Sequence, residues 1–200
     1  MTMIKKKRYS CLLIASALIM LAGCRNHTFP KPVGYFRIDM PAKSYRLYDT
    51  TCPFSFEYPV YGNISYEIGK VKHPCWFNIE FPGNRAKLHL SYAQLNGDLE
   101  AVLNESHEFA YSHSIKADAI TEQPFINAEK RVFGILYEIK GNAASSVQFV
   151  MTDSTRNFLR GALYFSSVPN EDSLTPVIKF YREDIIHLIE TLRWKGTDRK

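Results

Sequence analysis

Residues 131–166 read RVFGILYEIKGNAASSVQFVMTDSTRNFLRGALYFS, a stretch in which apolar runs alternate with short polar interruptions. Runs of this length, rich in Val, Phe, Leu and Tyr, are typical of β-strands. We expect three strands, separated by turns at Gly141-Asn142 and Asp153-Ser154: Arg131–Ile139, Ser145–Thr152 and Phe158–Ser166. The connections are too short to hold a helical crossover, so the strands form an antiparallel meander.

Two further strands and a helix precede this meander. The strands are expected at Leu88–Tyr92 and Ile120–Phe125, and the helix between them begins after Asn96 or Asp98 as its N-cap. Seven residues form one face of this helix: Leu99, Val102, Leu103, Ser106, Phe109, Ala110 and His113.

A second helix follows the meander, from about Pro176 to Trp194. Its apolar stripe comprises Ile178, Tyr181, Ile185, Leu188, Ile189 and Leu192. Its polar residues are expected to face water: Arg182, Glu183, Asp184 and Glu190. This order of elements predicts the α+β class, with an antiparallel β-sheet on which two main helices pack.

The segment from Tyr35 to Phe81 holds 12 aromatic residues among 47 and is typical of strands interrupted by prolines. Two of its pieces, CPFSFEYP at 52–59 and CWFNIEFP at 75–82, share a pattern at an offset of 23 residues. Each piece begins with a cysteine. A disulfide between Cys52 and Cys75 would stabilise the fold by about 3–3.5 kcal/mol in the chain-entropy treatment; two buried free thiols are the alternative.

The excess of positive charge belongs to the first 23 residues. The 200-residue chain has 25 Lys and Arg against 20 Asp and Glu, and Lys5–Arg8 supply four of the basic residues. Without this segment, 21 basic and 20 acidic residues remain, a net charge of +1. The charge therefore gives no support to nucleic-acid binding. No internal apolar stretch reaches the roughly 18 residues needed to span a bilayer.

The same segment resembles a bacterial lipoprotein signal peptide. The basic run precedes an apolar stretch of 11 residues, Cys11–Leu21, which is too short to span a bilayer. It leads into Leu21-Ala22-Gly23-Cys24, which resembles the lipobox cleaved by lipoprotein signal peptidase. We expect removal of residues 1–23 and lipidation of Cys24, which anchors the protein in a membrane. An ordinary secretory signal is the alternative.

The mature chain is expected to contain a lipidated tether over 24–32 and one α+β domain over 33–200. It lacks G-x-S-x-G, Walker, G-x-G-x-x-G and H-E-x-x-H motifs. His107 and His113 lie six residues apart and point in different directions on a helix. His73 beside Cys75 offers two ligands where zinc needs four. We therefore expect no catalytic residues, no metal and no cofactor.

Five runs of the mature chain form a recognisable set: PKPVGYFRIDMP at 30–41, CPFSF at 52–56, CWFNI at 75–79, LHLSY at 88–92 and LRW at 192–194. Together they resemble the GldD family of gliding-motility lipoproteins of Bacteroidota. The resemblance covers almost the whole mature chain, and P-K-P-x-G-Y-x-R-I-D is a specific motif.

The resemblance implies an outer-membrane lipoprotein that gliding and type IX secretion require, with a non-enzymatic accessory or assembly role. The implied partners are the membrane, through the lipid anchor, and other envelope proteins of gliding and type IX secretion. Two other classes stay open. One is a glycan- or peptidoglycan-binding module that uses exposed aromatic residues within Tyr35–Tyr66. The other is an envelope enzyme whose site is assembled from scattered residues.

Arg37 and Asp39, within the first of these runs, are expected on one side of an extended strand. There they pair with each other or with a partner protein. The tether residues Arg25–Thr28 lack the acidic run of surface-export signals in this phylum. We therefore expect the domain to face the periplasm.

Three tripeptides, DTT, DST and DSL, resemble O-glycosylation sites of Bacteroidota envelope proteins. Their acceptor residues are Thr50, Ser154 and Ser173. All three are expected in turns or loops, where a transferase can reach them.

Overall fold

The structure is a computed structural model that describes residues 38–66, 73–112, 117–166 and 171–196. Its contacts divide the chain into two units, Met1–Gly34 and Tyr35–Lys200, and every described residue belongs to the second unit. The predicted signal peptide, Cys24 and the predicted tether therefore lie outside the described residues.

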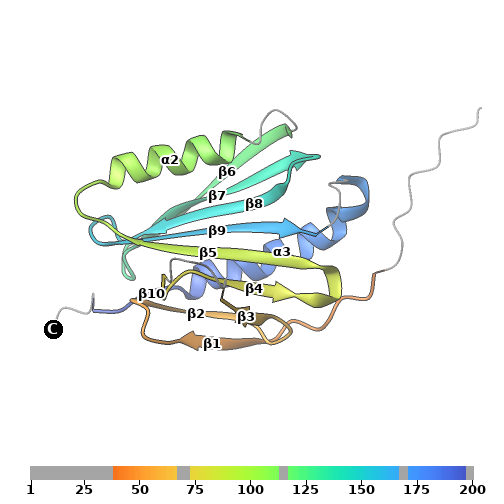
Figure 1. Cartoon of the computed structure of the whole chain (residues 1–200), viewed down its shortest axis with the longest axis horizontal. Coiled ribbons are helices and arrows are strands. Elements are labelled where there is room, and N and C mark those ends of the chain that lie inside the picture. Colours follow the sequence, from red (N-terminus) through yellow and green to blue (C-terminus); the bar gives the residue numbers. More distant parts are fainter. Residues whose placement is uncertain (1–37, 67–72, 113–116, 167–170, 197–200) are drawn as a thin grey trace, which may run out of the picture. The chain divides into compact units, whose positions relative to one another are not determined.

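Within the described residues the strands form two antiparallel sheets (Figure 1). The large sheet has the strand order β3-β4-β5-β9-β8-β7-β6. Its strands are β3 (Asn63–Ser65), β4 (Phe77–Phe81), β5 (Ala86–Gln94), β6 (Ala117–Asn127), β7 (Val132–Gly141), β8 (Ser145–Thr152) and β9 (Asn157–Phe165). In the small sheet, β2 (Phe54–Pro59) lies between β1 (Tyr45–Asp49) and β10 (Arg193–Trp194).

Helices α2 (Leu99–Ser112) and α3 (Glu171–Thr191) pack on opposite faces of the large sheet (Figure 1). Strand β8 shows this most directly, because successive side chains of a strand point to opposite faces. Val150 packs in the cluster beneath α2, whereas Phe149 and Met151 pack in the cluster beneath α3. Strand β8 is consequently buried along its whole length. No described helix combines the length and the apolar character needed to cross a bilayer.

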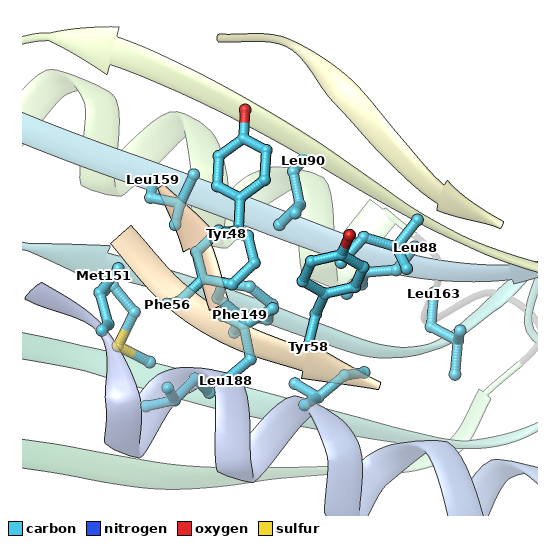
Figure 2. Close-up of a cluster of buried hydrophobic side chains, with 14 of the residues drawn as sticks. Tyr48, Phe56, Tyr58, Leu88, Leu90, Phe149, Met151, Leu159, Leu163 and Leu188 are labelled. Atoms are coloured by element: carbon cyan, nitrogen blue, oxygen red, sulfur yellow. The ribbon is translucent and has the colours of Figure 1, made fainter. Parts of the chain in front are cut away.

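The main core lies where the large sheet, α3 and the small sheet meet (Figure 2). Strand β2 contributes to it because Phe54, Phe56 and Tyr58 alternate with the half-buried Ser55 and Glu57. Side chains from all three elements gather there: Tyr48, Phe56, Tyr58, Leu88, Leu90, Phe149, Met151, Leu159, Leu163 and Leu188. Burying each such side chain contributes about 1.5–3 kcal/mol.

The predicted α+β class is confirmed, and so is the antiparallel meander. The expected strand Ser145–Thr152 coincides with β8, and the neighbouring predictions differ from β7 and β9 by one or two residues at each end. The turns also fall at the expected places. The backbone at Gly141 and Ser154 has the positive φ angles of turn residues, 99° and 66°.

The prediction for the last helix was wrong at both ends. Helix α3 begins at Glu171, five residues before Pro176, and it ends at Thr191. Trp194 belongs to β10 instead, where it pairs with Phe54. The Trp194 indole is buried and donates to the Arg131 carbonyl at 3.1 Å, so tertiary contacts override the helical pattern at this end.

The expectation that four polar residues of α3 face water was also partly wrong. Glu183 and Glu190 are exposed, but the Asp184 side chain is only 3% exposed. Arg182 lies against the large sheet, with Nε 2.6 Å from Glu138 Oε1. Because the large sheet and the small sheet both pack on α3, the helix buries a wider face than a single apolar stripe.

The two similar sequence pieces become strands of different sheets, β2 and β4. Phe56 and Phe77 stack across the boundary between the sheets, with ring centroids 6.3 Å apart. Cys52 and Cys75 lie beside this contact and are joined by a disulfide, with their Cα atoms 5.6 Å apart. The covalent link therefore connects the small sheet to the large sheet.

Candidate functional site

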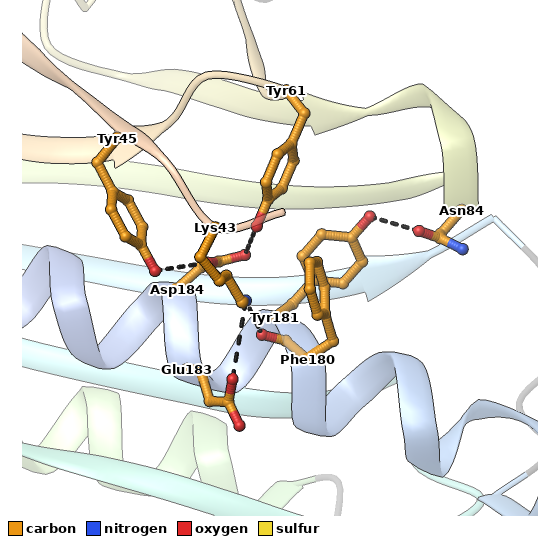
Figure 3. A network of polar contacts seen from close by, with 8 residues as sticks. All are labelled: Lys43, Tyr45, Tyr61, Asn84, Phe180, Tyr181, Glu183 and Asp184. Carbon is orange, nitrogen blue, oxygen red and sulfur yellow. Dashed lines mark hydrogen bonds and ion pairs between the residues drawn. The ribbon is translucent and has the colours of Figure 1, made fainter. Parts of the chain in front are cut away.

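A buried polar cluster that joins distant parts of the chain centres on Asp184 of α3 (Figure 3). Lys43 Nζ lies 2.7 Å from Asp184 Oδ1, and the Tyr45 hydroxyl donates to the same oxygen at 3.0 Å. The Tyr61 hydroxyl donates to Oδ2 at 2.5 Å. We call these four residues the Asp184 clamp. They tie the segment 43–61 to the middle of α3.

Lys43 makes the first contact of this clamp along the chain. Its ammonium group also donates to the Phe180 carbonyl at 2.7 Å and lies 3.4 Å from the centroid of the Phe180 ring. The carboxylate of Glu183 is 4.0 Å away. A half-buried ammonium group thus meets a carboxylate, a carbonyl and an aromatic face, which together offset the cost of its desolvation.

The clamp continues along α3 toward the small sheet. The Tyr45 ring stacks on His187 with a centroid distance of 3.6 Å, and His187 Nε2 lies 2.7 Å from Glu57 Oε2 of β2. In the other direction, the Tyr181 hydroxyl donates to Asn84 Oδ1 at 2.7 Å, just before β5. One face of α3 is therefore bonded to both sheets.

The electrostatics of the clamp keep its hydroxyls protonated. Burial, and then the negative charge of Asp184, raise the pKa of Tyr45 to about 12. Burial and the Asp184 hydrogen bond also raise the pKa of Tyr61, and burial raises that of Tyr181. Each phenol is therefore a donor across the physiological pH range. Asp184 accepts three hydrogen bonds on its two oxygens, so its carboxylate holds the segment 43–61 against α3.

A signal for this cluster was present in the sequence. Asp184 follows Tyr181 by three residues and precedes Leu188 by four, so it shares the face of the helix on which both are buried. The helical spacing alone would have placed it inside. Lys43 and Tyr61 carried no such signal, because their partner lies more than 120 residues away.

Of the residues expected to contact a partner, Arg37 lies outside the described residues and Asp39 is exposed. The expected strand does not include Asp39, because residues 38–44 have no regular secondary structure. Pro41 explains this, since proline removes a backbone donor and restricts the residue before it.

The histidines considered as ligands lie apart from one another, and His113 is outside the described residues. His107 is exposed, stacks on Tyr111 and lies 3.7 Å from Glu122. His73 stacks on the exposed Trp76. Among the residues that the structure describes, no three His, Cys, Asp or Glu side chains converge as metal ligands would.

The three expected glycosylation residues are all exposed, but their backbone settings differ. Thr50 lies in the turn after β1 and Ser154 lies in the turn between β8 and β9. Ser173 was wrongly placed in a loop, because α3 begins two residues before it.

Among the described residues, most aromatic side chains between Tyr45 and Phe81 are buried in the core rather than exposed on a sugar-binding surface. Within the expected glycan-binding segment, Tyr66 is 55% exposed, whereas Tyr48, Phe54, Phe56 and Tyr58 are buried. Further along, the exposed Trp76 donates its indole N–H to the Tyr92 carbonyl at 2.7 Å.

Comparisons with known proteins give a matching family and several similar solved structures. Curated protein sequences give no match. The solution structure of cyanobacterial PsbP (CyanoP) from Synechocystis sp. PCC 6803 is similar with a TM-score of 0.47 and 12% identity. That match covers 82% of this chain and 99% of the other. The family described as gliding motility lipoprotein GldD matches residues 25–194. Because this match includes nearly the whole chain after Cys24, the protein belongs to the GldD family of gliding motility lipoproteins.

Proposed function

We propose that the protein is an outer-membrane lipoprotein that acts as a non-enzymatic assembly factor in gliding motility and type IX secretion. Its family supports the role in motility. The run Leu21-Ala22-Gly23-Cys24 supports an acylated anchor at Cys24, and the lack of acidic residues in Arg25–Thr28 favours a domain that faces the periplasm. Its partners are the membrane and other envelope proteins of the same machinery.

The Asp184 clamp is the observation that carries this proposal. Lys43 lies 19 residues after Cys24, so at most about 65 Å of extended chain separates the lipid from the clamp. At Lys43 the chain is bonded to α3. The folded domain therefore begins within that distance of the membrane, and the chain from the anchor is bonded to α3 close to where it enters the domain. This arrangement suits a protein that contacts neighbouring envelope proteins beside a membrane.

The partners of Asp184 and His187 also favour assembly over catalysis. Asp184 accepts three donors, and His187 lies between Tyr45 and Glu57. Enzymes typically direct such groups into a cleft where a substrate can reach them. Here they join one secondary-structure element to another.

A complementation experiment tests the proposal. A strain that lacks the gene receives the wild-type gene or a variant, and gliding, secreted type IX cargo and the abundance of neighbouring envelope components are measured. Without the protein, we expect a neighbouring component to fall in abundance and secretion to fall with it. Arg37→Glu and Asp39→Lys should impair secretion, while the matched charge reversal Asp118→Lys on exposed β6 should not.

The enzyme alternative is tested in the same strain. His107→Ala and Glu183→Gln alter exposed groups and should leave secretion intact. If either variant abolishes secretion while the protein stays abundant and membrane-bound, the enzyme alternative replaces the assembly role. Asp184 is unsuitable for this test because its replacement weakens the fold itself.

A further inference from the structure

The face of the large sheet beneath α2 contains a hollow that the helix does not fill. Its volume is about 290 Å³, and its lining residues come from β5, β9 and the last turns of α2: His89, Ser91, Phe109, Arg160, Ala162 and Tyr164. We call it the Arg160 hollow. Ala162 pairs with His89 on one side and with Gln148 on the other, and its small side chain leaves the floor open between longer neighbours.

Arg160 brings a positive charge into this hollow. Its guanidinium lies 3.6 Å from the centroid of the Phe109 ring, and Nη2 lies 3.4 Å from Gln148 Oε1. Burial lowers the pKa of Arg160, although Tyr164 and Glu105 act in the opposite direction. Among the described residues, no carboxylate comes within 4 Å of this guanidinium. Such a charge is normally paired, so its surroundings favour an external anion.

Neutral donors surround the same charge. Ser91 lies directly opposite Arg160 in the β5–β9 pairing. Burial raises the pKa of Tyr164, so its hydroxyl stays protonated and can donate. Behind Arg160, Gln148 is 2% exposed and its Nε2 has no hydrogen-bond partner among the described residues. Through its Oε1 the same buried amide accepts from Arg160, so it helps to hold the guanidinium in place beside the hollow.

We propose that the Arg160 hollow binds an oxyanion, the phosphate or carboxylate group of a small molecule. The Arg160 guanidinium supplies the charge and a forked pair of N–H donors, a geometry that matches two oxygens of such a group. The Ser91 and Tyr164 hydroxyls supply further donors, and the Phe109 ring provides an apolar wall. The volume is at the small end of ligand pockets, which limits the ligand to a small molecule.

Thermal unfolding of the detergent-solubilised full-length protein tests this site. Sodium phosphate and sodium acetate are titrated in separate arms at constant ionic strength with chloride, so that the two oxyanions are distinguished. We expect at least one of them to raise the unfolding midpoint with half-saturation in the millimolar range. For Arg160→Gln we expect the half-saturating concentration of that anion to be about tenfold higher, because the loss of one charge-assisted hydrogen bond weakens binding by about that factor. Arg156→Gln, an exposed arginine on the same hairpin, is the control and should behave as wild type.

Chemical modification of the wild-type protein is a second test, which applies even if Arg160→Gln does not fold. Phenylglyoxal reacts with accessible guanidinium groups, and mass spectrometry gives the rate at each arginine. The effective anion should slow the reaction at Arg160 and leave that at Arg156 unchanged. The proposal is overturned if neither anion changes the midpoint up to about 50 mM. It is equally overturned if Arg160→Gln responds as wild type does, or if both arginines are protected alike.

Discussion

At the level of single residues, Asp184 is a side chain that joins distant parts of the chain through three polar contacts. Its carboxylate joins Lys43, Tyr45 and Tyr61 to α3. Asp184→Asn keeps the shape but removes the charge, and hydrogen bonds to a charged group contribute about 1.5–3 kcal/mol. We expect the free energy of unfolding in urea to fall by about that amount.

Glu183→Gln is the matched control for this measurement. Its side chain is 57% exposed and lies 4.0 Å from Lys43, so we expect a change of at most about 0.5 kcal/mol. Equal effects of the two substitutions would show that the buried clamp contributes no more than an exposed ion pair.

Asp153 gives the protein a specific dependence on acid. Burial alone would raise its pKa, but backbone N–H groups of Arg156, Asn157 and Thr155 outweigh burial and hold the pKa at about 2. The unfolded value is about 3.9. The stabilisation is therefore present above pH 4 and is lost as the pH falls toward 2, a change of about 2 kcal/mol.

Urea unfolding of wild type and Asp153→Asn between pH 7 and pH 2 measures this contribution. The variant should be less stable at pH 7, and the difference from wild type should shrink by about 2 kcal/mol toward pH 2. Asp118→Asn on the exposed face of β6 should follow the wild-type curve throughout. A constant difference across this range would contradict the assignment.

At the level of elements, the close packing of β7 on β8 requires a glycine. A Cβ atom on Gly134 would lie 1.9 Å from the Val150 carbonyl oxygen and 2.6 Å from Met151 Sδ. Gly134→Ala must therefore push two strands apart, and we expect the thermal midpoint to fall by an amount equivalent to about 2 kcal/mol or more. At Gly83 a Cβ would meet nothing within 4 Å, so Gly83→Ala should be neutral or slightly stabilising.

The link between the two sheets gives a second prediction at this level. In the folded native protein, Cys52 and Cys75 should resist alkylation until a reductant is added, and both should then react. Replacing both by alanine should cost about 3 kcal/mol, because the unfolded chain loses its cross-link. If both thiols react without reductant, the protein does not carry the bond in the cell.

The elements also show which parts of the fold are predictable from sequence. Strand β8 was predicted to the residue because eight consecutive residues between two turns can form only a buried strand there. The small sheet was not predictable as a unit. Its strand β10 has two residues, Arg193 and Trp194, too few for a periodic pattern, and its partner strand is 140 residues away. The candidate sites are hidden for a similar reason, since the Asp184 clamp joins residues more than 120 apart and the Arg160 hollow joins β9 to β5 and α2, about 50–75 residues earlier.

At the level of the whole molecule, we expect the proposed lipid anchor at Cys24 to determine where the protein acts. Cys24→Ala removes the predicted acylated thiol, so the protein should move from the membrane fraction to the soluble fraction and lose function. The intact mass of the native protein should show loss of residues 1–23 and added acyl chains. Protease added to intact cells should leave the protein uncut. Unchanged membrane retention of Cys24→Ala would contradict the anchor, and cleavage in intact cells would contradict the periplasmic orientation.

The pairing of β2 with β10 has a consequence for biosynthesis. A ribosome that adds about 5–20 residues per second makes Trp194 roughly 7–28 s after Phe54, its partner in the small sheet. Throughout that interval the start of β2 lacks its β10 partner, and for most of it the three aromatic side chains of β2 lack α3 to pack against. A nascent strand of this composition is prone to pair with other chains. We therefore expect the new chain to need a chaperone until its last strand is available.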